Sequence, residues 1–503
     1  MSSLKNDKDR PFWIGVLIIT LICAAFRLYN LSIRTYDWDE GDYALSSYYL
    51  YKGLVPYKDF QCTQPPLLFY LVALSFKIFG VGLWQAKLPG AICGILTAPL
   101  LIFIAKRMGC GNWSLLAGFA WTVSLPAIEN SRTVMMDVPV TFFTTLAVYF
   151  YIRGNYKLSG TALSIAVLTK LAAAPLFFVF LLHQLFFIQK RDLRKSFNWL
   201  KKFFLGALPL IILILVYAFY VGFYKFIDYT VFYHMAKESQ SWSYRYSLFR
   251  KIMKAYFFLF LFFFLNALFF LIYSDWRKII PATGKFLYLW FIILFLFIFV
   301  QKRPYSQHFI LILPPLCVFF SVFFKRLDTI IQSYTSSSSI QKIRFSHKNR
   351  ALFLSATFLI FTSIVIIGLA APSTIERSDS FYEDRLIVQR KIANFLIANI
   401  TPGQKVLSDL PIVNFLAKIE MPDNIVDISW GSIELTDYLT AEMLISAMKN
   451  NDVPYVIAEP DHTFAYLVEF HNYLQDHGIN IASELGEDVK NSGIEIWYIQ
   501  KNP

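Results

Sequence analysis

Long apolar runs separated by short polar connections make up most of the chain. Since a helix needs about 20 apolar residues to cross a bilayer, these runs predict a bundle of transmembrane helices. The first run, from Phe12 to Tyr29, follows Lys5, Lys8 and Arg10, which favour a cytoplasmic N-terminus. We expect further spans near residues 86–105, 113–129, 138–152, 156–170, 171–189, 203–222, 252–273, 284–301, 307–324 and 350–371. A total of about eleven spans would place the C-terminus on the outer side.

The shorter run from Leu67 to Phe79 decides the orientation of every later segment. It has about thirteen residues and contains Lys77, and this length is typical of re-entrant or interfacial segments. If the run crossed the membrane, the Lys106-Arg107 turn and the later basic loops would all be external, against the positive-inside rule. We therefore predict that the run lies on the outer surface.

The composition agrees with a polytopic membrane protein. Of 503 residues, 56% are hydrophobic, 18% are aromatic and only 16% are charged, against roughly 25% charged residues in soluble domains. The formal net charge of +13 arises from basic residues in short loops between apolar runs, so it reflects membrane topology and predicts no nucleic-acid partner. The five cysteines show no paired spacing and predict neither a disulfide framework nor a zinc site.

After Pro372 the sequence takes on the charge content and alternating patterns of a soluble domain. We predict helices at Arg385–Ile400, Ala441–Met448 and Phe464–Gln475, and strands at Lys405–Ser408, Asn424–Ser429, Tyr455–Ala458, Ile479–Ala482 and Ile494–Ile499. The chain therefore divides into an all-α polytopic membrane domain, residues 1–372, and a small extracytoplasmic α/β domain, residues 373–503.

A cluster of carboxylates directly follows the first apolar run. Asp37, Asp39, Glu40 and Asp42 lie in the first predicted outer connection, which continues as a short interfacial helix from Gly41 to Lys52. Acidic side chains held against a membrane are costly and are commonly functional. The alternative is a solvated connector that only sets topology, which is the plainer interpretation for Asp37 and Asp42.

Other outer connections contribute polar residues to the same side of the membrane. They are Asp59, Glu129, Arg132, Asp137, Lys170, Lys302, Arg303 and His308. Lys170, Arg303 and His308 could pair with an anionic head group. Each also has a structural explanation, because lysine and arginine can snorkel to the interface and a histidine can be a hydrogen-bonded core residue. Asp137 could simply cap a helix that has Pro139 in its first turn.

The order of these segments resembles that of the GT-C superfamily of membrane glycosyltransferases, in particular glycosyltransferase family 39 and the related protein mannosyl and aminoarabinose transferases. The matching segments are Trp38 to Ala44, Tyr57 to Phe60, Pro65 to Leu68, Ser131 to Pro139, Leu168 to Lys170, and Arg303 to Pro314. One departure is Gln64, where many relatives carry lysine or histidine. The resemblance implies an active-site loop over residues 31–85 and an inverting, single-displacement reaction. The C-terminal domain resembles no family.

Transfer from a polyprenyl-phosphate-linked sugar needs a base for the acceptor hydroxyl and cations for the leaving phosphate. We predict Asp39 as the catalytic base, with Glu40 orienting the acceptor or tuning its neighbour. Lys170, Arg303 and His308 would stabilise the phosphate. The other predicted substrate-binding residues are Arg132, Asp137 and Asp59. No metal-ligand spacing is present, although a divalent metal could be shared by Asp39, Glu40 and Asp137.

The sequence thus predicts a cell-membrane glycosyltransferase of the cell envelope that acts on a protein, lipid or polysaccharide hydroxyl. An oligosaccharide ligase or polymerase would use the same kind of lipid-linked donor and remains an alternative. A transporter is less favoured, because the chain has no internal repeat and its polar residues gather at the membrane edge rather than at mid-depth. A non-catalytic scaffold would leave the acidic cluster unexplained.

Overall fold

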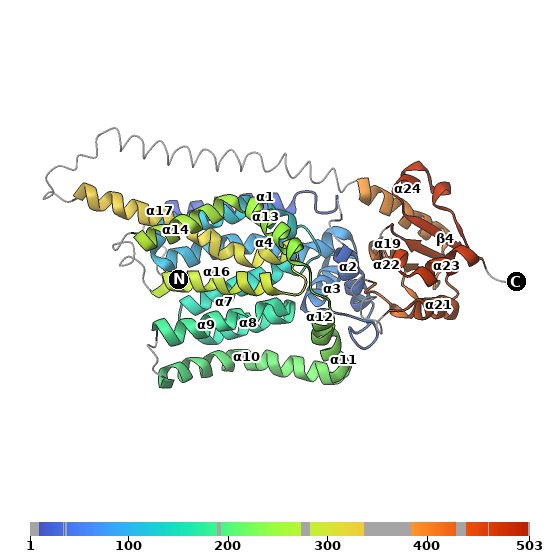
Figure 1. Ribbon diagram of the computed structural model, residues 1–503, viewed down its shortest axis with the longest axis horizontal. Helices are drawn as coiled ribbons and strands as arrows, with labels where there is room; N and C mark the ends of the chain where they lie inside the picture. Colours follow the sequence, from blue (N-terminus) through green and yellow to red (C-terminus); the bar gives the residue numbers. More distant parts are fainter. Residues whose placement is uncertain are drawn as a thin grey trace.

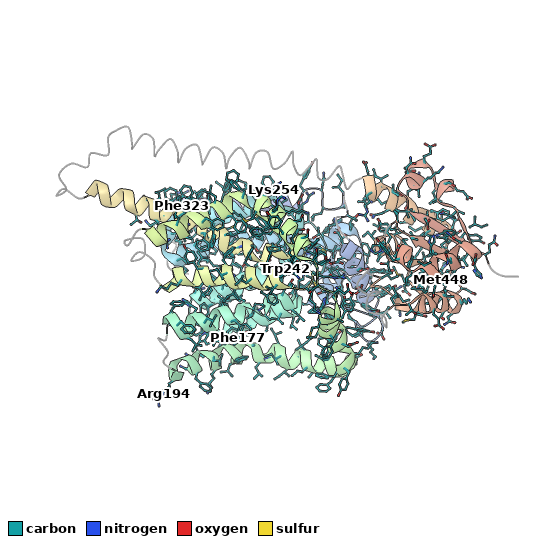
Figure 2. All side chains as sticks on the ribbon, viewed as in Figure 1. Phe177, Arg194, Trp242, Lys254, Phe323 and Met448 are labelled. Atoms are coloured by element: carbon teal, nitrogen blue, oxygen red, sulfur yellow. The ribbon has the colours of Figure 1, made fainter. Side chains whose placement is uncertain are left out.

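Helices that run side by side form the larger part of the protein, and the C-terminal domain lies at one end of them (Figure 1). The computed structural model describes residues 10–33, 35, 38–188, 193–272, 282–336, 384–428, 439–460 and 462–500. Arg194 lies toward the opposite end of the bundle, whereas Met448 lies in the C-terminal domain (Figure 2).

The bundle helices follow the apolar runs closely. They are α1 (Arg10–Leu28), α4 (Leu83–Ala105), α5 (Leu115–Val123), α7 (Asp137–Ile152), α8 (Tyr156–Thr169), α9 (Leu176–His183), α10 (Leu193–Val221), α13 (Trp242–Ala255), α14 (Phe257–Ile272), α16 (Ala282–Val300) and α17 (Leu313–Ser336). Five helical stretches in the described part of the chain are long and apolar enough to cross a membrane. The predicted span near 350–371 lies outside the described residues, so the total of eleven stays a prediction. The helices indicate a multi-pass membrane protein.

Short helices gather at the end of the bundle that faces the C-terminal domain (Figure 1). They include α2 (Trp38–Tyr51), α3 (Leu67–Phe79), α11 (Phe223–Ile227) and α12 (Tyr233–Ala236). The expectation of an acidic loop is wrong for Asp39 and Glu40, because α2 already begins at Trp38, whereas Asp42 lies in the helix predicted from Gly41. The first turn of a helix favours carboxylates, since its unpaired N–H groups carry partial positive charge. Asp37 lies outside the described residues.

The C-terminal domain is built on a small mixed sheet with the strand order β1-β2-β4-β3. The strands are β1 (Leu407–Ser408), β2 (Tyr455–Ala458), β3 (Gly478–Asn480) and β4 (Glu495–Ile499), and only β1 and β2 are parallel. Residues 384–399 are helical, and further helices are α19 (Pro411–Ala417), α21 (Ala441–Asn450), α22 (Thr463–Tyr466), α23 (Val468–His477) and α24 (Glu487–Asn491). The strand predicted at Asn424–Ser429 is wrong for residues 424–428, where the backbone turns and Ile428 N donates to Val426 O.

A shared apolar core joins the C-terminal domain to α2 and α3. The rings of Phe76 and Phe415 stack with centroids 5.8 Å apart, and Met421 N donates to Tyr49 Oη at 2.7 Å. Helices α2 and α19 approach so closely that a methyl group on Gly41 would lie 2.6 Å from Ile412 N. The glycine is therefore required at this position by the contact between the two domains.

We expect Gly41→Ala to destabilise the docked arrangement by about 1–3 kcal/mol, because the added methyl group must push backbone apart. Thermal unfolding of the purified protein measures the effect. Gly15→Ala on α1 is a matched control, since its methyl group would meet only the end of the Leu115 side chain. An equal shift for both variants would contradict the close contact between α2 and α19.

Candidate active site

A polar cavity of about 320 Å³ lies where α2, the connection after α16 and the C-terminal domain meet. Its charged or titratable lining residues include Asp39, Asp42, Lys237, Arg303, Asp427 and His462. The last two come from the C-terminal domain, so the cavity needs both domains. Carboxylates and cations thus line the same cavity. Such an arrangement suits a reaction in which negative charge passes from one group to another.

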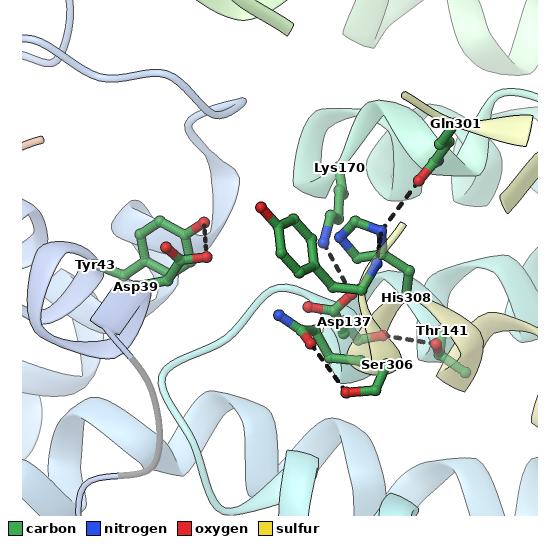
Figure 3. A network of polar contacts seen from close by, with 10 residues as sticks. Asp39, Tyr43, Asp137, Thr141, Lys170, Gln301, Ser306 and His308 are labelled. Carbon is green, nitrogen blue, oxygen red and sulfur yellow. Dashed lines mark hydrogen bonds and ion pairs between the residues drawn. The ribbon is translucent and has the colours of Figure 1, made fainter. Parts of the chain in front are cut away.

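Asp39 borders this cavity from the first turn of α2 and is half-buried. Tyr43, one helical turn further on, donates its hydroxyl to Asp39 Oδ2 at 3.4 Å (Figure 3). Burial raises the pKa of Tyr43 well above its ordinary value, and the negative charge of Asp39 raises it further. The phenol therefore stays protonated and remains a donor to the carboxylate.

Glu40 faces away from the cavity, into the protein. Its Oε1 lies 3.3 Å from Lys87 Nζ, and both side chains are fully buried. The same oxygen accepts a hydrogen bond from Val134 N at 3.0 Å. Glu40 thus joins α2 to α4 and to the connection before α7, and this position does not match its predicted role beside the acceptor.

Asp137 and Lys170 form a second ion pair at the same end of the bundle (Figure 3). Because α7 and α8 pack against each other, the first turn of α7 meets the residue that follows α8. Lys170 Nζ lies 2.8 Å from Asp137 Oδ1, and Asp137 is only 1% exposed. Its other oxygen, Oδ2, is buried without a hydrogen-bond partner among the described residues. Asp137 is the first residue of α7, one position after the N-cap residue Met136, so it does not take the N-cap position.

Arg303 and His308 lie in the connection between α16 and α17 but have different surroundings. Arg303 lines the cavity and donates from Nε to Glu238 O at 3.3 Å. His308 lies beside Lys170 and pairs with Gln301 through Nδ1 at 3.0 Å (Figure 3). Tyr305 connects the two groups, since it borders the cavity and its ring packs 5.4 Å from that of His308.

Arg132 and Asp59 have structural roles that the sequence did not distinguish from binding roles. Arg132 is buried and donates to Tyr29 O at 2.8 Å, at the end of α1. Asp59 Oδ2 accepts from Val55 N at 2.7 Å and stabilises a turn. Neither residue lines the cavity that contains Asp39.

Four residues of the site were missed as site residues in the sequence. Lys237 belongs to the connection between α10 and α13, where a lysine on the predicted outer side could have drawn attention. His234, on α12, donates from Nε2 to Thr63 O at 2.7 Å. Burial, with the nearby charge of Lys237, lowers the pKa of His234 to about 4, so the ring is neutral at neutral pH. Asp427 and His462 come from the other domain, and no sequence signal connects them to Asp39.

Asp39, Glu40 and Asp137, the residues that could have shared a divalent metal, do not form a metal-binding group in the described part of the chain. No group of three or more histidine, cysteine, aspartate or glutamate side chains there could hold a metal ion. Glu40 and Asp137, two of the three proposed ligands, are each paired with a lysine instead.

The fold and the cavity define a multi-pass membrane protein with a polar site at one end of its helices. Residues 63–220 match the model of the dolichyl-phosphate-mannose-protein mannosyltransferase family. Over 158 residues, 30% of this chain, the sequence is 23% identical to a putative mannosyltransferase, YkcB, of Bacillus subtilis. Matches to curated relatives span 22–39% of those proteins' own lengths.

Two solved structures share this fold over most of the chain. ArnT from Cupriavidus metallidurans, bound to undecaprenyl phosphate, superposes with a TM-score of 0.63 at 14% identity over 96% of this chain and 97% of its own. The oligosaccharyltransferase AglB from Archaeoglobus fulgidus, in complex with an inhibitory peptide and a dolichol-phosphate, gives a TM-score of 0.54 at 12% identity, over 90% of this chain and 70% of its own. The chain has the fold of the GT-C glycosyltransferases, which confirms the resemblance found in the sequence.

We expect Lys87→Met or Glu40→Gln to lower stability strongly. Losing one partner of a buried ion pair leaves a charge or polar group uncompensated, at a cost of about 3–5 kcal/mol for the charge. The double variant Glu40→Gln/Lys87→Met should be less destabilised than the sum of the two single changes. Thermal unfolding of the four proteins measures this coupling, and additive losses would show that the pair does not act as a unit.

Proposed function

We propose that the protein is an inverting glycosyltransferase that moves a sugar from a polyprenyl-phosphate-linked donor to an acceptor hydroxyl at the outer membrane face. The observation that carries the proposal is the polar cavity that Asp39 lines together with Lys237 and Arg303. The GT-C fold supports it, and one neighbour with this fold is bound to undecaprenyl phosphate. On this proposal the cavity and the C-terminal domain face the extracytoplasmic side.

In the proposed reaction the acceptor hydroxyl attacks C1 of the donor sugar. Its proton passes to Asp39, a bond forms between the acceptor oxygen and C1, and the bond from C1 to the phosphate oxygen breaks with its electron pair left on the phosphate. A single displacement from the opposite face of the sugar inverts the configuration at C1. Tyr43, which donates to Asp39, holds the carboxylate in place.

The leaving phosphate would be stabilised by Lys237 and Arg303. Both line the cavity, and fixed cations in an enclosed site lower the free energy of a transition state in which negative charge develops. Lys170, predicted for this role, is engaged with Asp137. We propose that the Asp137–Lys170 pair and His308 support Tyr305, which lines the cavity.

The proposal of a lipid-linked donor is supported by an apolar cavity in the helix bundle. Its volume is about 480 Å³, and it is lined by residues of α5, α14 and α17, with Lys254 at the end of α13. Lys254 and Phe323 lie on the same side of the bundle (Figure 2). A prenyl chain would gain free energy from burial between these aromatic and aliphatic side chains, in proportion to the apolar area removed from water.

An enzyme that transfers a whole oligosaccharide is the second candidate. A groove of about 660 Å³ lies beside the cavity, between residues 58–61, α11 and the C-terminal domain. Gln61 lines both volumes, so they adjoin. Such a groove has room for a glycan, and the AglB neighbour is an oligosaccharyltransferase.

We expect Asp39→Asn to reduce sugar transfer by about a hundredfold or more, because the amide cannot accept the proton of the acceptor. The measurement uses membranes with equal amounts of protein and a panel of radiolabelled polyprenyl-phosphate sugars. Asp476→Asn is the control, since Asp476 is exposed on α23 and lines neither the cavity nor the groove. Full activity of the Asp39 variant would remove this residue as the base, and transfer from none of the donors would refute the proposed function.

We expect Arg303→Gln and Lys237→Gln each to lower transfer by about tenfold to a hundredfold, because each removes a cation beside the leaving phosphate. Lys251→Gln, an exposed change on α13, controls for altered charge at the surface. Initial rates at saturating donor, measured for all three variants, give the comparison. If the two cavity variants matched the control, the phosphate site would have to lie elsewhere.

A further inference from the structure

The C-terminal domain contributes a histidine and an aspartate to the lining of the cavity that contains Asp39, and a second aspartate lies behind them. Asp427 and His462 line the cavity itself. Asp409 is fully buried behind them, and its Oδ2 lies 3.5 Å from His462 Nδ1. The mechanism described above uses none of these side chains.

The sheet explains why these residues meet. Asp409 directly follows β1, and Glu459 directly follows β2, the strand parallel to it. Segments at the carboxyl ends of neighbouring parallel strands lie side by side, and this edge of a sheet is a frequent position for ligand sites. The edge faces the helical domain at the cavity.

Hydrogen bonds hold the residues around His462 in place. Asp409 accepts from Glu459 N at 2.8 Å and from Phe464 N at 2.9 Å, one with each carboxylate oxygen. Thr463 donates to Ile428 O at 2.8 Å, which ties it to the backbone beside Asp427. The two residues that follow His462 are therefore fixed, and His462 lines the cavity beside them.

Contacts between the domains fix the distance across the cavity. Thr63 Oγ1 donates to Asp427 Oδ2 at 2.6 Å, and Thr35 Oγ1 donates to Gln389 Oε1 at 2.7 Å. Both bonds join the first connection of the helical domain to the C-terminal domain. The C-terminal domain, which carries His462, is therefore hydrogen-bonded to residues before and after α2. Asp39 lies on α2.

The chemistry of Asp427 and His462 suits a hydroxyl compound and not a phosphate. A carboxylate such as Asp427 repels an anionic group but accepts hydrogen bonds from hydroxyls, and a histidine ring can donate or accept them. The two cations of the cavity, Lys237 and Arg303, come from the helical domain. The donor phosphate would therefore bind to residues of the helical domain, and the acceptor hydroxyls to residues of the C-terminal domain.

We propose that His462 contacts the acceptor in the active site, and that Asp409 is the positioning residue that fixes its ring. The acceptor class is a hydroxyl-rich molecule, such as a carbohydrate, that is bound between His462 and Asp39. This inference rests on the proposed function. It makes the C-terminal domain a part of the active site that selects the acceptor and leaves donor binding to the helical domain.

Two measurements on the full-length protein separate these roles. The first is transfer of radiolabelled sugar from the donor panel to acceptors in native membranes. The second is the rise in unfolding temperature of the purified protein on addition of undecaprenyl phosphate, which reports binding of the lipid phosphate alone. His462→Gln is compared with His477→Gln, a change in the same domain at an exposed histidine that packs on Tyr473.

We expect His462→Gln to lower transfer at least tenfold, with the thermal shift caused by undecaprenyl phosphate and the unfolding temperature of the free protein both unchanged. His477→Gln should match wild type in every measurement. Asp409→Ala should lower transfer as far as His462→Gln, and Asp409→Asn should recover part of it, because the amide oxygen can still accept a backbone hydrogen bond.

Other outcomes overturn the proposal. Unchanged transfer in His462→Gln would mean that the histidine only closes the cavity. A parallel loss of transfer and of the undecaprenyl phosphate shift would assign it to donor binding. If His462→Gln does not fold, His462→Asn replaces it under the same criteria. Wild-type protein that transfers sugar from none of the donors would refute the proposed function itself, whether or not undecaprenyl phosphate shifts its unfolding temperature.

Discussion

A carboxylate that is removed from water needs a fixed partner, and this requirement organises the end of the bundle where the site lies. Glu40 is paired with Lys87 and Asp137 with Lys170, and both pairs join elements far apart in the chain. Glu40 lies in the first turn of α2 and Asp137 in the first turn of α7, so each pair fixes the start of one helix against a neighbouring element. Asp39 differs, because it borders the cavity, where it accepts a hydrogen bond from the hydroxyl of Tyr43. In the proposed mechanism it is the carboxylate that meets the acceptor.

The second requirement is that the C-terminal domain stays docked on α2. Close packing at Gly41, the stacked rings of Phe76 and Phe415, and the bond between Thr63 and Asp427 hold the two domains together. The cavity exists only in this docked state, since its lining comes from both sides. A change that weakens the contact between the two domains therefore also changes the shape of the site.

The sequence predicted the helices well, because the length of an apolar run is set by the membrane. The helix expected at residues 138–152 is α7, Asp137–Ile152, and the strand expected at Tyr455–Ala458 is β2 with the same ends. The positions of Asp137, Lys170, Arg303 and His308 at one end of the bundle also followed from the alternation of spans. The separate roles of Asp39, Glu40 and Asp59 did not, because they depend on which way each side chain points from a helix or a turn. Lys87 lies inside an apolar run, which indicated a buried partner, but the sequence could not identify Glu40 as that partner. The presence of His462 in the same cavity as Asp39 depends on how the two domains fit together.

A structure of the protein with undecaprenyl phosphate bound would decide where the donor lies. The proposed mechanism places the phosphate within hydrogen-bond distance of Arg303 and Lys237, and leaves room for a sugar between the phosphate and Asp39. The prenyl chain should then run along the helices and away from the C-terminal domain. A phosphate bound at the opposite end of the bundle, near Arg194, would contradict both the proposed site and the orientation of the protein in the membrane.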